Sequence, residues 1–158
     1  MIFDDFADFA AALEPMRPLI GLDTGTRTVG VAASDALLAS AGAVETVRRT
    51  RFAADAARIL AIARDRDAAG IVLGLPRNMD GSEGPRCQSV RAFARNLARL
   101  SDLPIGFWDE RLSTVAAERA LLEADLTRKR RKEVIDAVAA AYILQGALDR
   151  LRHLRTEQ

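Results

Sequence analysis

The sequence predicts a single α/β domain in which helices flank a mixed β-sheet of about five strands. Three strand-like segments follow one another between residues 19 and 49, and helical and strand-like segments then alternate along the rest of the chain. This order is typical of a mixed sheet with helices packed on it. The chain has 158 residues, of which 49% are hydrophobic, so it can bury one sizeable core.

Composition excludes several classes of protein. The 23 Lys and Arg residues nearly balance 22 Asp and Glu residues, so net charge indicates no partner. One cysteine excludes an internal disulfide, and one cysteine with one histidine cannot form a conventional structural zinc site. No apolar run reaches the roughly 18 to 20 residues that span a bilayer, and the first ten residues are acidic where a signal peptide would be basic. We therefore expect a cytoplasmic protein with no membrane partner.

The first 17 residues predict a short helix that docks on the domain. Four apolar side chains recur at spacings of four, three and four, at Ile2, Phe6, Phe9 and Leu13. Pro15 and Pro18 then end the helix. We expect an N-terminal extension of residues 1–17, a domain of residues 18–152 and a tail of residues 153–158.

The first half of the domain predicts a hairpin, a third strand and a helix. Residues 19–34, LIGLDTGTRTVGVAAS, contain two β-rich runs separated by a Gly/Thr turn. A third strand is expected at 41–49. Residues 51–70 then have apolar positions at helical spacing and end in Gly70, which we interpret as the helix C-cap.

The second half alternates strands and helices. Residues 71–76, IVLGLP, are continuously apolar, as in a strand that is buried on both faces. A Gly/Pro-bearing loop at 77–86 precedes a helix at 88–100 and a strand at 104–110. We expect three further segments: a helix from 114 to about 124, a basic loop, and a final helix that includes KEVIDAVAAAYILQ at 132–145.

Acidic residues stand at positions that solubility does not explain. Asp23 ends the first strand, Asp109 and Glu110 end the strand at 104–110, and Asp136 interrupts an apolar helix. Sites in such sheets form beyond the strand ends. Because strand side chains alternate between faces, only one of Asp109 and Glu110 can point into a common site. Converging carboxylates need a cation, and Mg²⁺ or Mn²⁺ prefers such ligands.

Each acid also has a simpler interpretation. Asp23 can initiate a turn, because Asp-Thr-Gly is ordinary turn chemistry. Asp109 and Glu110 can be a solvated strand end. Asp136 can be favoured by the dipole at the start of its helix or form a salt bridge with the neighbouring basic residues.

Candidate substrate contacts are mostly cationic. The loop at 77–86 can offer backbone N–H groups to phosphates, together with Arg77, Asn78 and Arg86. Five consecutive positive charges precede Asp136, namely Arg128, Lys129, Arg130, Arg131 and Lys132. Further candidates are Thr26, Arg27 and Arg111. Plain surface loops and turn support are the alternatives for most of these residues, and pairing with a carboxylate is the alternative for Arg111.

The sequence resembles the YqgF family of bacterial nucleases, also called RuvX. Four segments in order carry the resemblance: GLDTGTRTVGVAASD (21–35), IVLGLPRNMDGSEGP (71–85), DERLST (109–114) and RRKEVIDAVAAAYIL (130–144). The resemblance covers about residues 19–150 and implies an RNase H-like fold. It also implies a catalytic, metal-binding triad of Asp23, Glu110 and Asp136 with one or two Mg²⁺ or Mn²⁺ ions, and it selects Glu110 over Asp109.

The function implied by the resemblance is metal-dependent hydrolysis of phosphodiester bonds, with processing of the 5′ end of pre-16S rRNA as the favoured role. A Holliday-junction-type DNA resolvase and a non-catalytic factor that binds RNA or ribosomal particles are the alternatives. Two other classes are disfavoured. An aspartic protease needs a second Asp-Thr-Gly triplet, and an actin-like ATPase generally needs two lobes. The sequence reveals no dimer interface, so the oligomeric state stays open.

Overall fold

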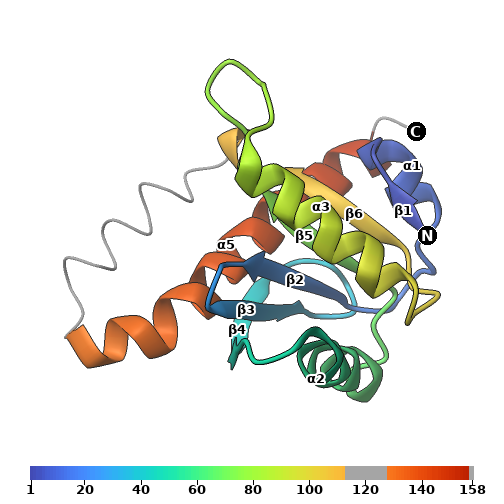
Figure 1. Cartoon of the computed structure of the whole chain (residues 1–158). Helices are drawn as coiled ribbons and strands as arrows, with labels where there is room; N and C mark the ends of the chain where they lie inside the picture. Colours follow the sequence, from blue (N-terminus) through green and yellow to red (C-terminus); the bar gives the residue numbers. More distant parts are fainter. Residues whose placement is uncertain (113–127, 157–158) are drawn as a thin grey trace.

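A computed structural model of the chain describes residues 1–112 and 128–156, and it contains a six-stranded sheet (Figure 1). The strands are β1 (Ile2–Phe3), β2 (Leu19–Thr24), β3 (Thr28–Ser34), β4 (Ala41–Arg48), β5 (Gly70–Leu75) and β6 (Ile105–Asp109). The helices are α1 (Phe6–Ala11), α2 (Phe52–Asp65), α3 (Pro85–Ala98) and α5 (Arg128–Thr156), with a short 3-10 helix, η1 (Glu110–Leu112), after β6.

The sheet is mixed, as predicted, and its strand order is β1-β6-β5-β2-β3-β4. β2, β3 and β4 pair antiparallel, because short connections join them, while β5 pairs in parallel with both β2 and β6. The sixth strand, which the sequence did not predict, comes from the N-terminal extension. β1 pairs in parallel with the first two residues of β6, Ile105 and Gly106.

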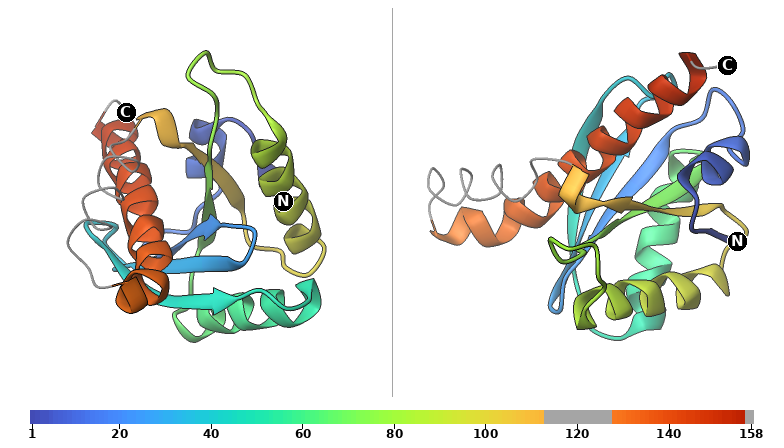
Figure 2. Two further views of the ribbon diagram at one scale, coloured as in Figure 1. Left: turned by 60° about the vertical axis from the view of Figure 1, so that its left-hand side comes forward. Right: turned by 90° about the horizontal axis from the view of Figure 1, so that it is seen from above.

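Helices cover both faces of the sheet. In Figure 2, α5 crosses one face while α2 and α3 lie on the other. β2 and β5 are buried along their whole length, which explains why β5 and the first four residues of β2 are continuously apolar rather than alternating. The core between the sheet and α2 and α3 is aliphatic apart from a few aromatic rings, whereas α1 and α5 share the second core with Trp108.

The helix of the N-terminal extension is shorter than predicted, but the extension packs on the domain as expected. Asp5 caps α1, because its carboxylate accepts from the backbone N–H of Ala7 at 2.7 Å. Phe9 is fully buried, and its ring lies directly over Gly106 of β6. The extension therefore adds both a strand and a helix to the domain.

Two local predictions were wrong. Gly70 is not the C-cap of α2, since the helix ends at Asp65 and Asp67 adopts the left-handed conformation, with φ of 55°, that Asp tolerates. Gly70 instead begins β5. The basic run 128–132 is not a loop but the start of α5, because Lys and Arg are good helix formers and no Gly or Pro interrupts them.

The helix predicted at 114–124 lies outside the described residues. Among the helices that the structure describes, none combines the length and the apolar character needed to cross a membrane.

Replacing Gly106 with alanine should destabilise the protein by about 1–3 kcal/mol, because the new methyl group would lie 2.6 Å from the Phe9 ring. Gly42→Ala is the matched control, since no atom lies within 4 Å of a methyl group there. Chemical denaturation measures both free energies of unfolding. Equal stability of the two variants would contradict the docking of the extension.

Candidate active site

Asp23 lies near the end of β2 and is only 7% exposed. It stands directly opposite Gly30 of β3, and residues opposite each other in an antiparallel pair share a face of the sheet. Gly30 faces α5 so closely that a methyl group there would overlap the backbone of Asp136. Asp23 therefore faces α5 at the point where Asp136 passes over the neighbouring strand.

Asp136 is half-buried, and its carboxylate accepts a hydrogen bond from the hydroxyl group of Thr28. Thr28 is two residues before Gly30 on β3, so its side chain lies on the same face. The helix-dipole interpretation of Asp136 is wrong, because α5 begins eight residues earlier and the dipole acts within the first turn. The side chains at 128–134, on which the salt-bridge alternative depends, lie outside the described ones.

Glu110 begins η1, immediately after β6. Its carboxyl carbon lies 3.3 Å from the position that a methyl group on Gly74 would occupy, and Ile143 of α5 contacts the same position. Leu73 of β5 pairs with Leu22 of β2, so the next residues along these strands are Gly74 and Asp23. Glu110 therefore lies over β5, on the α5 face, next to the position of Asp23.

Asp109 has a different environment from its neighbour. Its carboxylate accepts from the Arg111 guanidinium, with an Nη2–Oδ2 distance of 2.7 Å, and these bonds hold the pKa of Asp109 below its usual value. Strand alternation could not choose between Asp109 and Glu110. The structure separates them, since Asp109 is held by Arg111 while Glu110 lies on the α5 face.

The three carboxylates thus come from β2, η1 and α5 to one face of the sheet. They do not form a metal cluster as placed: within residues 1–112 and 128–156, no group of three His, Cys, Asp or Glu side chains could hold a metal ion. In its chemistry, an all-carboxylate set of donors fits Mg²⁺ or Mn²⁺. The side chain of Asp136 is engaged with Thr28.

The turn between β2 and β3 exposes Thr26 and Arg27 beside Asp23. Arg49, which no sequence pattern singled out, holds this turn. Its guanidinium donates to the carbonyl oxygen of Gly25 at 2.5 Å, and its backbone N–H donates to Arg27 at 2.8 Å. The guanidinium also stacks over Phe93 of α3, 5.4 Å from the ring centroid.

The loop after β5 is held by its own polar groups. Asn78 bonds to Ser82 through both its backbone and its side chain, and Ser82 also donates to Asp80. Arg111 donates to the carbonyl oxygen of Met79 at 3.3 Å, which ties the loop to the segment that carries Glu110. Arg86 is exposed in the first turn of α3.

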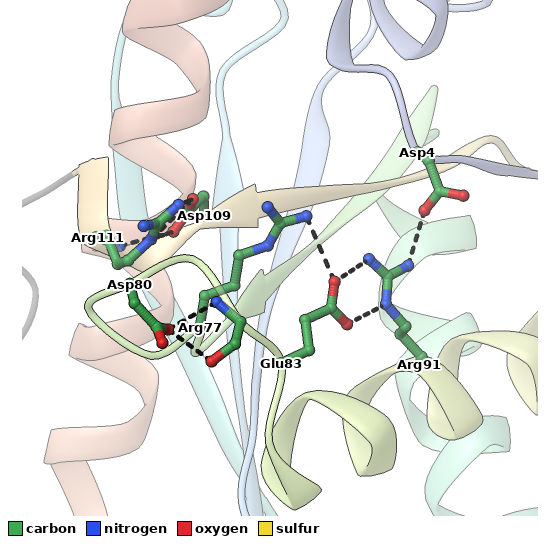
Figure 3. Close-up of polar contacts among 8 residues, drawn as sticks. Asp4, Arg77, Asp80, Glu83, Arg91, Asp109 and Arg111 are labelled. Carbon is green, nitrogen blue, oxygen red and sulfur yellow. Dashed lines mark hydrogen bonds and ion pairs between the residues drawn. The ribbon is translucent and has the colours of Figure 1, made fainter.

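An ion-pair network, which the sequence did not predict, joins this loop to the N-terminal extension (Figure 3). Arg91 of α3 donates to both oxygens of Glu83, at 2.6 and 2.7 Å, and to Asp4 at 2.7 Å. These bonds lower the pKa of Glu83. Arg77 approaches the same Glu83 carboxylate at 3.4 Å. No spacing rule links Asp4 to Arg91, because they are 87 positions apart.

Comparison with known proteins identifies the family. The family model described as "RuvX: Holliday junction resolvase" matches residues 17–150. The chain belongs to the RuvX family. A protein of Ruegeria sp. strain TM1040 named "Putative pre-16S rRNA nuclease" is 70% identical over 99% of both chains. A protein of the same name from Roseobacter denitrificans is 69% identical over 100% of this chain and 98% of its own.

Solved structures confirm the fold of this RuvX protein. Thermus thermophilus RuvC in complex with a Holliday junction substrate matches with a TM-score of 0.54 and 15% identity, over 86% of this chain and 96% of that one. The yeast mitochondrial Holliday junction resolvase Ydc2 matches with a TM-score of 0.51 and 8% identity, over 96% and 90%. The predicted RNase H-like fold is therefore confirmed.

Thr28→Val should lower the free energy of unfolding by about 1–2 kcal/mol, because a half-buried carboxylate loses its hydroxyl donor. In an Asp136→Asn background the same substitution should cost less, since the bond to a charged acceptor is already gone. A double-mutant cycle from denaturation curves measures the difference. Thr26→Val, in the exposed turn, is the control, and additivity of the two changes would contradict the bond.

Arg111→Gln should raise the pKa of Asp109 toward its ordinary value of 3.8, as the guanidinium hydrogen bonds are lost. The folded pKa is lowered in the parent protein. The stability that the pair of Asp109 and Arg111 contributes is therefore fully present above about pH 3.8. It is lost as the pH falls through the lowered pKa of Asp109 in the folded protein. Carboxyl NMR titration measures the pKa, and an unchanged value in the variant would refute the assignment.

Proposed function

We propose that this RuvX protein is a divalent-metal-dependent endonuclease that hydrolyses phosphodiester bonds at the 5′ end of pre-16S rRNA. The observation that carries the proposal is that three carboxylates, from β2, η1 and α5, lie on one face of an RNase H-like sheet. The names of the relatives support RNA as the substrate.

In this proposal Asp23, Glu110 and Asp136 hold one or two Mg²⁺ or Mn²⁺ ions. When bound, such an ion polarises a phosphate and lowers the pKa of a water molecule. Asp23 is the rigid member, because it lies within a strand that is paired on both sides. Thr28 restricts the orientation of the Asp136 side chain.

Cationic residues elsewhere in the chain suit a polyanionic substrate. Arg27 is exposed in the turn that follows Asp23, and Arg86 is exposed at the start of α3. The helix that carries Asp136 begins with five consecutive basic residues at 128–132. Attraction of phosphates by such residues supplies affinity without sequence specificity.

Removing a single carboxylate should reduce cleavage by at least about a hundredfold, since even residues that only support metal ligands cost 10–100-fold when mutated. The variants are Asp23→Asn, Glu110→Gln and Asp136→Asn, which preserve shape while removing charge. Asp109→Asn is the matched control, because Asp109 is adjacent to Glu110 but pairs with Arg111. Gel analysis of ribosomal RNA precursor with Mn²⁺, Mg²⁺ or chelator measures the rates.

The outcomes separate the candidate functions. Wild-type cleavage by any of the three carboxylate variants would end the assignment of that residue. RNA binding without metal-dependent cleavage would favour a non-catalytic factor. The family description and the titles of the structural neighbours make a Holliday junction resolvase the second candidate. A synthetic four-way junction, incubated in parallel, tests that activity.

A further inference from the structure

A cavity lies at the outer edge of β6, next to the segment that carries Glu110. β1 pairs only with Ile105 and Gly106, so it leaves the second half of β6 without a neighbouring strand on that side. A cavity of about 190 Å³ occupies this place. Its walls come from the N-terminal extension, α3, α5 and the end of β5. Asp109 and Leu112, which flank Glu110 in the sequence, also line it.

Flat groups make up much of the cavity wall. Phe6, Phe107 and Trp108 all line it, and Phe6 meets Trp108 edge to face with centroids 5.9 Å apart. The guanidinium of Arg91 lies 4.9 Å from the centre of the Phe107 ring. Nucleobases stack on aromatic rings and on guanidinium groups, and this stacking depends little on which base is present. The volume is below the roughly 300–1,000 Å³ of pockets for drug-sized ligands, so it suits one ring system.

The lining of the cavity carries one more arginine than aspartate. Three arginines line it, Arg77, Arg91 and Arg150, against two aspartates, while Glu83, which does not line it, pairs with Arg77 and Arg91. Both aspartates already accept from guanidinium groups, Asp4 from Arg91 and Asp109 from Arg111. The aspartates therefore repel a phosphate less than bare carboxylates would.

Arg77 has a buried donor that no described residue uses. Its Nε is shielded from solvent and has no hydrogen-bond partner among the described residues, although its Nη2 approaches Glu83. Buried donors without an acceptor are costly and uncommon. A ligand oxygen in the cavity would supply the missing acceptor.

We propose that this cavity binds one unpaired nucleotide of the RNA strand close to the cleaved phosphate, with the base against the aromatic wall and an oxygen accepting from Arg77. The proposal rests on the proposed function for its substrate class. It gives the N-terminal extension a role in substrate binding through Phe6, outside the residues that the family model matches.

The test measures binding rather than cleavage, in an Asp23→Asn background that preserves the RNA. Fluorescence anisotropy with a labelled single-stranded RNA that spans the 5′ end of 16S rRNA gives the dissociation constant, and an abasic nucleotide replaces each position in turn. One abasic position should weaken binding about tenfold, within the 1–3 kcal/mol of a stacked base. In Arg77→Gln or Phe6→Leu the same abasic substitution should have little further effect.

Two control variants isolate the role of Arg77. Glu83→Gln removes its ion-pair partner but keeps the arginine, so binding should be unchanged or tighter. Arg58→Gln removes an arginine of equal charge that pairs with Glu45 on the α2 side, and it should change binding less than about twofold. Thermal melting verifies that each variant is folded.

The outcomes distinguish this proposal from the proposed function. An abasic penalty that is the same with and without Arg77, or a Glu83→Gln variant that binds as weakly as Arg77→Gln, would overturn the cavity proposal even if wild-type protein cleaves RNA. Absence of RNA binding would also overturn it. A position-specific coupling in a protein that never cleaves RNA would support the cavity and overturn the nuclease assignment.

Discussion

The close approach of α5 to the sheet is the constraint on which the candidate site depends. At Gly30 the strand has no side chain between its backbone and that of Asp136, so the helix rests directly on the sheet. The approach is close again at Gly74, where Ile143 and Glu110 occupy the space that a side chain would take. Larger residues at either position would lift the helix and separate Asp136 from the strands.

This contact also explains how a charged residue is tolerated in an apolar helix. Asp136 lies over β3, whose first residue, Thr28, supplies a hydroxyl donor. Asp23, on the adjacent strand, pairs with Gly30 of β3 and is nearly inaccessible to solvent. Burial of carboxylates near one another is unfavourable without compensation, and sites that retain them are commonly functional.

The N-terminal extension completes the sheet at its other side. It pairs with the start of β6, buries Phe9 against Gly106 and reaches the loop after β5 through Asp4 and Arg91. The extension therefore contacts β6, the strand before Glu110, directly and is joined through Arg91 of α3 to the loop that Arg111 holds. Substrate contacts at this edge would depend on residues that are remote from the carboxylates in sequence.

Five of the six strands, most of the helices, the mixed sheet and the candidate acids could be predicted from the sequence, because periodicity and turn chemistry are local properties. The assignments of Gly70 and of the basic run were wrong, because Asp67 could end the turn after α2 in place of a glycine and because Lys and Arg can continue a helix as well as form a loop. Strand alternation could not separate Glu110 from Asp109, and the structure gave the physical difference between them, because Asp109 pairs with Arg111. The bond between Thr28 and Asp136 and the ion pair between Asp4 and Arg91 came from the folded structure alone. These choices depend on which side chains meet across the sheet, and spacing along one chain carries no information about partners that folding brings together.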